Sequence, residues 1–353
     1  MKKKLLLMVI CICTASLVSV AKKAVVVSTL QLPPAEAIYN EGIKLLRQKQ
    51  YDDAIIKFTA TIAEDTTFTK AYYNRAIAYF ESERYNKAIN DLNVAIRQAD
   101  NETASECYLL KGKIMFYLDD IKQALTDVNK AIELNSSNIN ARLDKAALLQ
   151  YNREYTLAEK EYSNILSISP GNASALLERG NCRQHIGQLE AAMNDYKIIV
   201  INDSSNFQAK LNIATLTWKI SADTLNSILL LNKLAKENPQ SAEVFNARGL
   251  IYSLTAQYDS AIVDFDKAIG INRNYATAYN NRGSAYYKQN KLEKAIDDYN
   301  SAIEINTNYG DAYLNRAIVK ELLRDENGSC NDLQIAAKLG VKNASEYFTK
   351  QCE

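Results

Sequence analysis

The chain has 353 residues, 47 % of them hydrophobic, and only 11 glycines and 4 prolines, which favours ordered helix over disorder. Lysine and arginine total 42 residues against 41 aspartates and glutamates, so the sequence lacks the basic footprint of a nucleic-acid-binding protein. The length allows two ordinary domains or one long repeat array, and it is sufficient to bury a core.

Residues 1–21 have the pattern of a secretory signal peptide. A lysine triplet at residues 2–4 precedes an uncharged, largely apolar run at residues 5–20, and residues 19–21 read Ser-Val-Ala, small residues at the cleavage spacing. A retained membrane anchor is the alternative, but the run is shorter than the roughly 20 residues that a spanning helix needs. Cleavage removes three lysines and no acid, so we expect 39 basic and 41 acidic residues and no membrane span in the mature chain.

Residues 22–34, KKAVVVSTLQLPP, carry no repeat pattern and end in two prolines. They fit an extended linker between the signal peptide and the repeats. They could also belong to the export segment.

A repeat of about 34 residues fills residues 35–341, with phases that begin at residues 35, 69, 105, 139, 173, 207, 242, 276 and 310. Position eight of every phase is Gly or Ala. Position twenty is Ala or Ser in every phase once one extra residue of the sixth phase is placed in its turn. Larger residues surround these small ones at helical spacing, as in Tyr279, Gly283 and Tyr286, so each phase predicts two amphipathic helices that approach closely at the small residues.

The segment AYNNRGSAYYKQNKLEKAIDDYNSAIEIN in the eighth phase resembles a tetratricopeptide repeat, and the likeness extends over about residues 35–340. The sixth phase departs from the pattern, since Lys210 replaces the large aromatic residue. The resemblance implies an all-α fold, a right-handed superhelical solenoid of antiparallel helix pairs with first helices lining a concave groove. Independently, a single pair cannot bury both of its faces, so stacking must supply the core.

Charges at positions seven and twenty-three are complementary within each repeat. Position seven reads Glu41, Arg75, Lys111, Lys145, Arg179, Ile213, Arg248, Arg282 and Arg316; position twenty-three reads Lys57, Asp91, Asp127, Glu161, Asp195, Leu230, Asp264, Asp298 and Asp332. The first repeat swaps the signs and the sixth makes both residues apolar. We therefore predict an ion pair between the two helices of a repeat, and a structural role for the arginines in preference to clamping a carboxylate ligand.

The C-terminal residues 342–353 predict a capping helix, with Ala344, Tyr347 and Phe348 on one face and Gly340 ending the helix before it. Counting helical rise up to Leu339 and back down brings Cys330 and Cys352 to one level. We predict a disulfide between them, with two buried thiols as the alternative. Cys107 and Cys182 are expected to be packing residues. The lysine-led signal and this closed end resemble bacterial exported proteins, so we expect a periplasmic, cell-surface or secreted location.

The implied groove places positions two, five, six, nine and twelve of the first helices on one surface. A row of amides there could bond an extended peptide backbone, anchored by apolar side chains of the first three repeats. Alternatively, the aromatic residues complete the packing and the amides are solvated. The candidate residues are Tyr39, Asn40, Ile43, Tyr73, Asn74, Ile77, Phe80, Leu109, Phe116, Asn212, Asn246, Asn280, Asn281, Tyr287 and Asn315.

Nothing in the sequence predicts catalysis, a cofactor or a metal. His185, the single histidine, falls at the end of a first helix, where we expect a surface residue. The chain has no nucleophile elbow, zinc-binding helix motif or phosphate loop, and the cysteine spacing fits no metal site. We predict a non-enzymatic scaffold that binds a protein or peptide in the groove. The alternative is a structural or assembly subunit, for example of an oligomer in the cell envelope.

Overall fold

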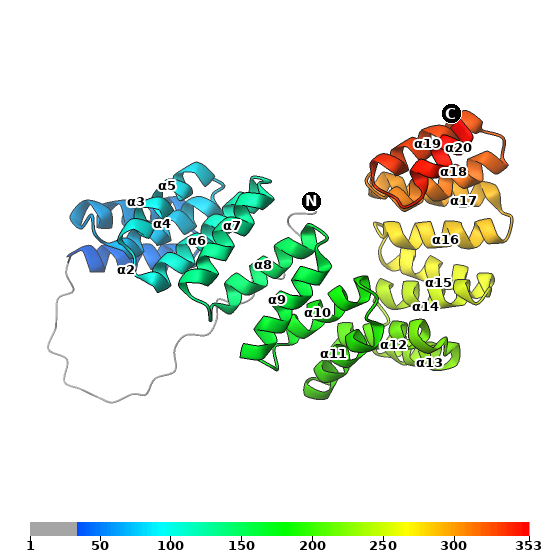
Figure 1. Cartoon of the computed structure of the whole chain (residues 1–353), viewed down its shortest axis with the longest axis horizontal. Helices are drawn as coiled ribbons and strands as arrows, with labels where there is room; N and C mark the ends of the chain where they lie inside the picture. Colours follow the sequence, from blue (N-terminus) through cyan, green and yellow to red (C-terminus); the bar gives the residue numbers. More distant parts are fainter. Residues whose placement is uncertain (1–33, 353) are drawn as a thin grey trace. The chain divides into compact units, whose positions relative to one another are not determined.

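The structure, a computed structural model, describes residues 34–352. The predicted signal peptide and the predicted linker up to residue 33 lie outside the described residues. Residues 34–352 form nineteen α-helices and no β-strand, so the all-α fold is confirmed (Figure 1). In chain order the helices are α2 (Pro34–Arg47), α3 (Tyr51–Glu64), α4 (Thr69–Glu81), α5 (Tyr85–Gln98), α6 (Asn101–Tyr117), α7 (Ile121–Leu134), α8 (Ile139–Tyr151), α9 (Tyr155–Ile168), α10 (Ala173–His185), α11 (Leu189–Asn202), α12 (Phe207–Ser221), α13 (Thr224–Glu237), α14 (Ala242–Leu254), α15 (Tyr258–Ile271), α16 (Ala276–Lys288), α17 (Leu292–Ile305), α18 (Gly310–Leu322), α19 (Glu326–Lys338) and α20 (Ala344–Cys352).

The described residues form two compact units, and the division falls between Asp195 and Tyr196. In the first unit α2 packs on α3, α4 on α5, α6 on α7, and α8 on α9. In the second unit α12 packs on α13, α14 on α15, α16 on α17, and α18 on α19. Each second helix also contacts the first helix of the next pair within its unit, for example α3 with α4 and α15 with α16. The predicted stack of helix pairs is therefore present in each unit. None of the described helices is long and apolar enough to cross a membrane.

The buried core lies between successive repeats. One cluster joins Leu92 of the second repeat to Cys107 and Ile114 of the third, and another joins Leu231 of the sixth to Val244 of the seventh. These side chains are fully buried. A single helix pair would expose them to water, so stacking supplies the core as expected.

The first helices begin close to the phases read from the sequence. Helices α4, α8, α10, α12, α14, α16 and α18 begin at the phase residue itself. Helix α6 begins at Asn101, four residues before the phase at 105, because the side chain of Asp100 accepts a hydrogen bond from the backbone N–H of Thr103 and caps an extra turn.

The small residue at position eight lies under a large side chain at position twenty-four. A Cβ added to Gly283 would lie 2.9 Å from Cε1 of Tyr299, and one added to Gly249 would lie 2.8 Å from Cε1 of Phe265. Because a real Cβ does not approach so closely, a side chain added at either glycine would force the ring above it to move. The small residues at position eight thus mark where the two helices of a repeat pack closely.

The turn between the helices of a repeat contains one residue with left-handed backbone geometry. It stands at position fifteen in eight repeats and at Ala222, position sixteen, in the sixth. The extra residue of the sixth repeat therefore lies at the turn, as predicted. In the fifth repeat this residue is Gly187, whereas the others have residues with a side chain there: Lys49, Glu83, Asp119, Arg153, Ala256, Asn290 and Arg324.

The C-terminal end is closed by α20. Gly340, with φ +75°, follows the end of α19 as predicted, and Ala344 is fully buried against the last repeat. The side chain of Tyr347, on the same helix, is 45 % exposed. Cys330 and Cys352 form a disulfide, with their Cα atoms 5.7 Å apart, while Cys107 and Cys182 are free and buried.

Candidate functional site

The first helices of successive repeats touch one another and form a continuous face in each unit. Contacts join α2 with α4 and α4 with α6 in the first unit, and α12 with α14, α14 with α16 and α16 with α18 in the second. The predicted groove residues all belong to these first helices. Side chains about 34 residues apart in sequence therefore become neighbours on what we call the first-helix face.

The charged pairs predicted within repeats are present. Arg75 Nε and Nη2 each lie 2.7 Å from a carboxylate oxygen of Asp91, and Arg248 holds Asp264 in the same forked way at 2.7 and 2.6 Å. The remaining pairs are Glu41–Lys57, Lys111–Asp127, Lys145–Glu161, Arg179–Asp195, Arg282–Asp298 and Arg316–Asp332. These charges hold helices together, so they are not available as a ligand clamp.

Five of the arginines also reach back to the preceding repeat, a contact that the sequence analysis missed. In each case Nη1 donates to a side chain sixteen residues earlier, at position twenty-five of the preceding repeat. The acceptors are Thr59, Ser163, Asn232, Asp266 and Asn300. The signal was present in the sequence, because position twenty-five carries an oxygen acceptor wherever position seven of the next repeat is arginine. One arginine thus ties three helices together.

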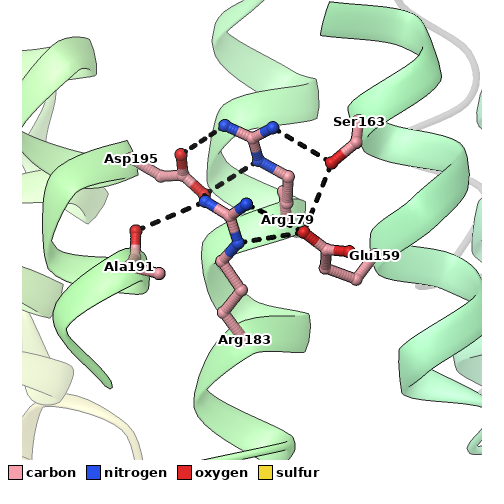
Figure 2. Close-up of polar contacts among 6 residues, drawn as sticks. All are labelled: Glu159, Ser163, Arg179, Arg183, Ala191 and Asp195. Atoms are coloured by element: carbon pink, nitrogen blue, oxygen red, sulfur yellow. Dashed lines mark hydrogen bonds and ion pairs between the residues drawn. The ribbon is translucent and has the colours of Figure 1, made fainter. Parts of the chain in front are cut away.

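The largest of these networks lies in the fifth repeat, where two arginines share one aspartate (Figure 2). Arg179 binds Asp195 with Nε and Nη2 at 3.0 and 2.6 Å. Arg183, one turn later, places Nη1 2.9 Å from Asp195 and Nη2 2.8 Å from Glu159. Asp195 is 1 % exposed, so its charge depends on both guanidinium groups for compensation.

In the second unit the predicted row of amides is real, but its members bond to one another. Asn281 Nδ2 donates to Asn246 Oδ1 at 3.0 Å, and Asn315 Nδ2 donates to Asn280 Oδ1 at 3.0 Å. The accepting residues are buried, whereas Asn281 and Asn315 are half-buried. Among the described residues, the other N–H and the carbonyl oxygen of Asn281 and of Asn315 have no partner. These two amides can therefore still bond a ligand.

The amides elsewhere are placed differently. Asn74 uses both N–H groups, donating to Tyr39 Oη and to the backbone oxygen of Lys70, each at 2.9 Å. Asn40 is exposed. The carbonyl oxygen of Asn212 accepts a hydrogen bond from Gln208 at 3.1 Å.

The predicted apolar anchors divide into buried and accessible side chains. Leu109 and Phe116 are 3 % and 5 % exposed and belong to a core cluster, so they complete the packing. Ile43, Tyr73, Ile77, Phe80 and Tyr287 are half-buried, and they are the ones a ligand could touch. Their role in binding stays a prediction.

Three acidic side chains on α6, α8 and α10, namely Glu106, Asp144 and Glu178, were not among the predicted site residues. Glu106 accepts from Asn138 at 3.0 Å, and Glu178 accepts from Gln150 at 3.1 Å. Asp144 and Glu178 were missed because the prediction followed asparagine at position six, where the fourth and fifth repeats have these acids instead, whereas Glu106 stands at position two of the third repeat.

Asp144 is the most perturbed of these acids. It is 5 % exposed, and burial raises the pKa of its carboxyl group to about 6. Lys113 Nζ lies 3.4 Å from Oδ2 and opposes this shift, but Oδ2 accepts no hydrogen bond. The middle of the first-helix face in the first unit thus holds a carboxyl group that titrates near neutral pH.

The single histidine, His185, ends α10, is exposed and stacks on Tyr155 with ring centroids 4.1 Å apart. Among residues 34–352, no group of three or more His, Cys, Asp or Glu side chains could hold a metal ion.

Four family models match the chain, and because two of them overlap they cover three stretches. Models described as tetratricopeptide repeat match residues 39–103, 105–138 and 276–309, and one described as TPR repeat matches residues 257–290. The matched stretches lie in both units, and two of them, 105–138 and 276–309, begin at phases read from the sequence.

Relatives in other organisms share part of their length with this chain. The chain is 28 % identical over 204 residues to the human RNA polymerase II-associated protein 3, covering 56 % of this chain and 29 % of that protein. It is 26 % identical over 251 residues to the chicken DnaJ homolog subfamily C member 3, covering 63 % of this chain and 50 % of that protein. The chain thus spans half or less of the length of these two relatives.

Two solved structures share the fold. A tetratricopeptide repeat protein from Parabacteroides merdae matches with a TM-score of 0.63 and 21 % identity, over 72 % of this chain and 97 % of that one. Yeast Tom70 matches with a TM-score of 0.56 and 14 % identity, over 89 % of this chain and 93 % of that one.

Proposed function

Because this chain is a tetratricopeptide repeat protein, we propose that it is a non-enzymatic scaffold that holds a segment of a partner protein along its first-helix face. One observation carries the proposal. Asn281 and Asn315 stand one repeat apart, are fixed by Asn246 and Asn280, and each retain hydrogen-bonding groups without a partner among the described residues. A side chain held in place by a neighbour loses less conformational entropy when it binds a ligand.

The accessible apolar side chains supply the second part of the proposed surface. Ile43 and Ile77 in the first unit and Tyr287 in the second are half-buried on first helices, so a partner side chain that covers any one of them removes further apolar area from water. The charged pairs at positions seven and twenty-three fix the helices beneath this face. We infer that the amides orient the partner segment and that the apolar residues anchor it.

Site-specific photo-crosslinking in the cells that make the protein tests the proposal. A photoreactive phenylalanine analogue replaces Ile77 or Tyr287 on first helices, or Ile56 or Val263 on second helices. The controls are matched in kind, since Ile56 and Val263 are 63 % and 66 % exposed. We expect the same crosslinked polypeptide from both first-helix positions and none from the controls. Crosslinking that does not depend on the face would overturn the proposal.

A size measurement on the purified chain separates this function from that of an assembly subunit. A scaffold that awaits a partner should run as a monomer over the concentrations used for crosslinking. If the chain instead forms a closed oligomer and Ile77 crosslinks to another copy of itself, the first-helix face is an assembly interface.

We also propose that the protein is exported to an oxidising compartment, periplasmic, cell-surface or secreted. The disulfide between Cys330 and Cys352 supports this proposal, because such bonds persist mainly outside the reducing cytoplasm. Burial raises the pKa of the Cys107 and Cys182 thiols to about 12, which leaves them poorly reactive. The protein is taken from its native cell, unfolded without a reductant, alkylated and analysed by mass spectrometry. Cys107 and Cys182 should be alkylated, and Cys330 and Cys352 should be protected by their disulfide. Four free thiols would contradict export.

A further inference from the structure

The sixth repeat lacks the ion pair of the other repeats and has a pocket in its place. Ile213 on α12 and Leu230 on α13 occupy positions seven and twenty-three. Together with Val200 and Leu234 they line a pocket of about 210 Å³, whose rim carries Lys210, Lys233 and Glu237. The repeats on either side have charged side chains at both positions, so the pocket is a local departure from the common plan.

The outer face of α13 carries two exposed leucines. Leu225 is 73 % exposed and Leu229 is 57 % exposed. Position eighteen, that of Leu225, is polar in all the other repeats: Asp52, Asn86, Lys122, Thr156, Glu190, Asp259, Glu293 and Asn327. Since Leu225, Leu229 and Lys233 follow one another at four-residue spacing, they form one stripe along the helix that ends at the pocket rim. Two large exposed leucines beside an apolar pocket indicate a contact surface.

The charges around this surface are basic. Residues 196–237 contain five lysines and three acids, and all three acids are engaged. Asp203 accepts from Ser205, Asp223 caps α13 through the backbone N–H of Asn226, and Glu237 pairs with Lys210 at 3.3 Å. Lys233 and Lys197 form no ion pair within the described residues. An acidic partner would meet uncompensated positive charge here.

We propose that the sixth repeat carries a second interaction surface, made of Leu225, Leu229, Lys233 and the pocket, which binds an acidic amphipathic segment of a partner protein. A large apolar side chain of that segment fills the pocket between Ile213 and Leu230. Its carboxylates lie on Lys233, which has no ion-pair partner within the described residues. Leu225, Leu229 and Lys233 lie on the second helix α13, and Lys210 and Ile213 of α12 occupy positions four and seven, which are not among the predicted groove positions.

A second copy of the same chain fits this surface less well. A two-fold interface places a patch against itself, so Lys233 and the neighbouring lysines would face their own copies. Like charges brought together at an interface oppose association. The charge of the patch therefore favours a partner of opposite charge.

The test measures the affinity of the full chain for three fluorescent synthetic helical peptides of about four turns. The first has leucine at every third and fourth position and glutamate elsewhere, the second replaces glutamate with lysine, and the third replaces leucine with serine. We expect the first peptide to bind on the order of tenfold more tightly than the serine peptide, the scale of burying one large apolar side chain. It should also bind more tightly than the lysine peptide, because the surface is basic. Equal affinity for the lysine peptide, or no binding of the first peptide at about 1 mM, would overturn the proposal.

Residues borrowed from other repeats provide the matched variants. The new side chains of Leu225→Asp/Leu229→Asn already occur at these positions in other repeats, as Asp259 at position eighteen of the seventh and Asn90 at position twenty-two of the second. Folding of the variant should therefore be preserved. This variant should lose about tenfold in affinity for the acidic peptide, and Lys233→Glu should reverse the preference between the two charged peptides. Val263→Asn, at position twenty-two of the seventh repeat, is the control and should bind as the wild type does.

Two results with these variants would overturn the proposal. One is an unchanged affinity of Leu225→Asp/Leu229→Asn for the acidic peptide. The other is a concentration-dependent dimer of the wild-type chain that this variant abolishes, because the surface would then bind a second copy.

Discussion

The sixth and seventh repeats lie in the same unit and share one backbone plan, yet they join their two helices by different means. In the seventh repeat the forked Arg248 binds Asp264 and reaches back to Asn232 of the sixth. In the sixth repeat Ile213 and Leu230 stand at the equivalent positions, and the helices still pair. A helix pair therefore does not require the ion pair. It requires that the residues at positions seven and twenty-three are either oppositely charged or both apolar, because a charge without its partner is costly to bury.

The largest expected effect comes from breaking the match in the seventh repeat. Arg248→Ile leaves Asp264, 4 % exposed, without its counter-charge, and we expect a loss of about 3–5 kcal/mol in the free energy of unfolding. Urea denaturation of the full chain, followed by circular dichroism, measures it. Lys57→Ile in the first repeat is the control, and it should lower stability much less because Lys57 and Glu41 are both exposed. Similar losses in the two variants would contradict the account.

A second expected effect depends on pH and distinguishes the acidic fourth repeat from the neutral amide pairs of the second unit. Burial raises the pKa of Asp144 from 3.8 to about 6, so the folded chain holds this proton more tightly than the unfolded chain does. The stability that protonated Asp144 contributes to the folded chain is fully present below about pH 4 and is lost as the pH rises through about 6. The whole shift corresponds to roughly 3 kcal/mol.

Thermal denaturation between about pH 4 and pH 8 tests this prediction. The Asp144→Asn variant is the comparison, since its side chain does not titrate. We expect the difference in melting temperature between variant and wild type to grow in favour of the variant as the pH rises. A difference that is constant with pH would show that Asp144 has an ordinary pKa.

A third, smaller effect compares the eighth repeat, which has Gly283 beneath Tyr299, with the ninth, which has Ala317 and Leu333 at the same positions. Gly283→Ala should cost about 1–3 kcal/mol, because the new Cβ forces the tyrosine ring to move. Adding Tyr299→Leu should return part of the loss. Gly270→Ala, where the added Cβ meets nothing within 4 Å, is the control and should stabilise α15 slightly. If Gly283→Ala is as well tolerated as Gly270→Ala, the close approach is not real.

The smallest effect concerns the turns of the fifth and seventh repeats. Ala256 has φ +60° where the fifth repeat has Gly187, and left-handed geometry costs a residue with a side chain roughly 1 kcal/mol. Ala256→Gly should therefore raise the melting temperature slightly, even though glycine gains entropy on unfolding. Gly187→Ala should lower it. Calorimetry of the two variants checks this, and the same sign in both would contradict the account.

Much of the fold could be predicted because each repeat repeats the same packing problem. The pairing of position seven with position twenty-three followed from the sign reversal at Glu41 and Lys57 and from the apolar pair Ile213 and Leu230. Each repeat of the single sequence thus gave independent evidence for the same contact. Small residues at position eight marked the helix crossing for the same reason.

The parts that could not be predicted depend on contacts between repeats or on backbone geometry. The bond from Asn281 to Asn246 joins position six to position five of the preceding repeat, and only coordinates show that these side chains meet. The left-handed turn residue was hidden because lysine, glutamate and arginine occupy it in place of glycine. Helix α6 starts early because of a cap at Asp100, which lies outside the repeat pattern.

A double-mutant cycle on Arg248 and Asp264 tests most directly the claim that matched partners, and not charge itself, hold the helix pairs. The double variant Arg248→Ile/Asp264→Leu transfers the apolar pair of the sixth repeat into the seventh. We predict that it recovers at least about 2 kcal/mol of the stability that Arg248→Ile loses. If the losses of the two single variants simply add, the two side chains do not depend on each other and the account is wrong.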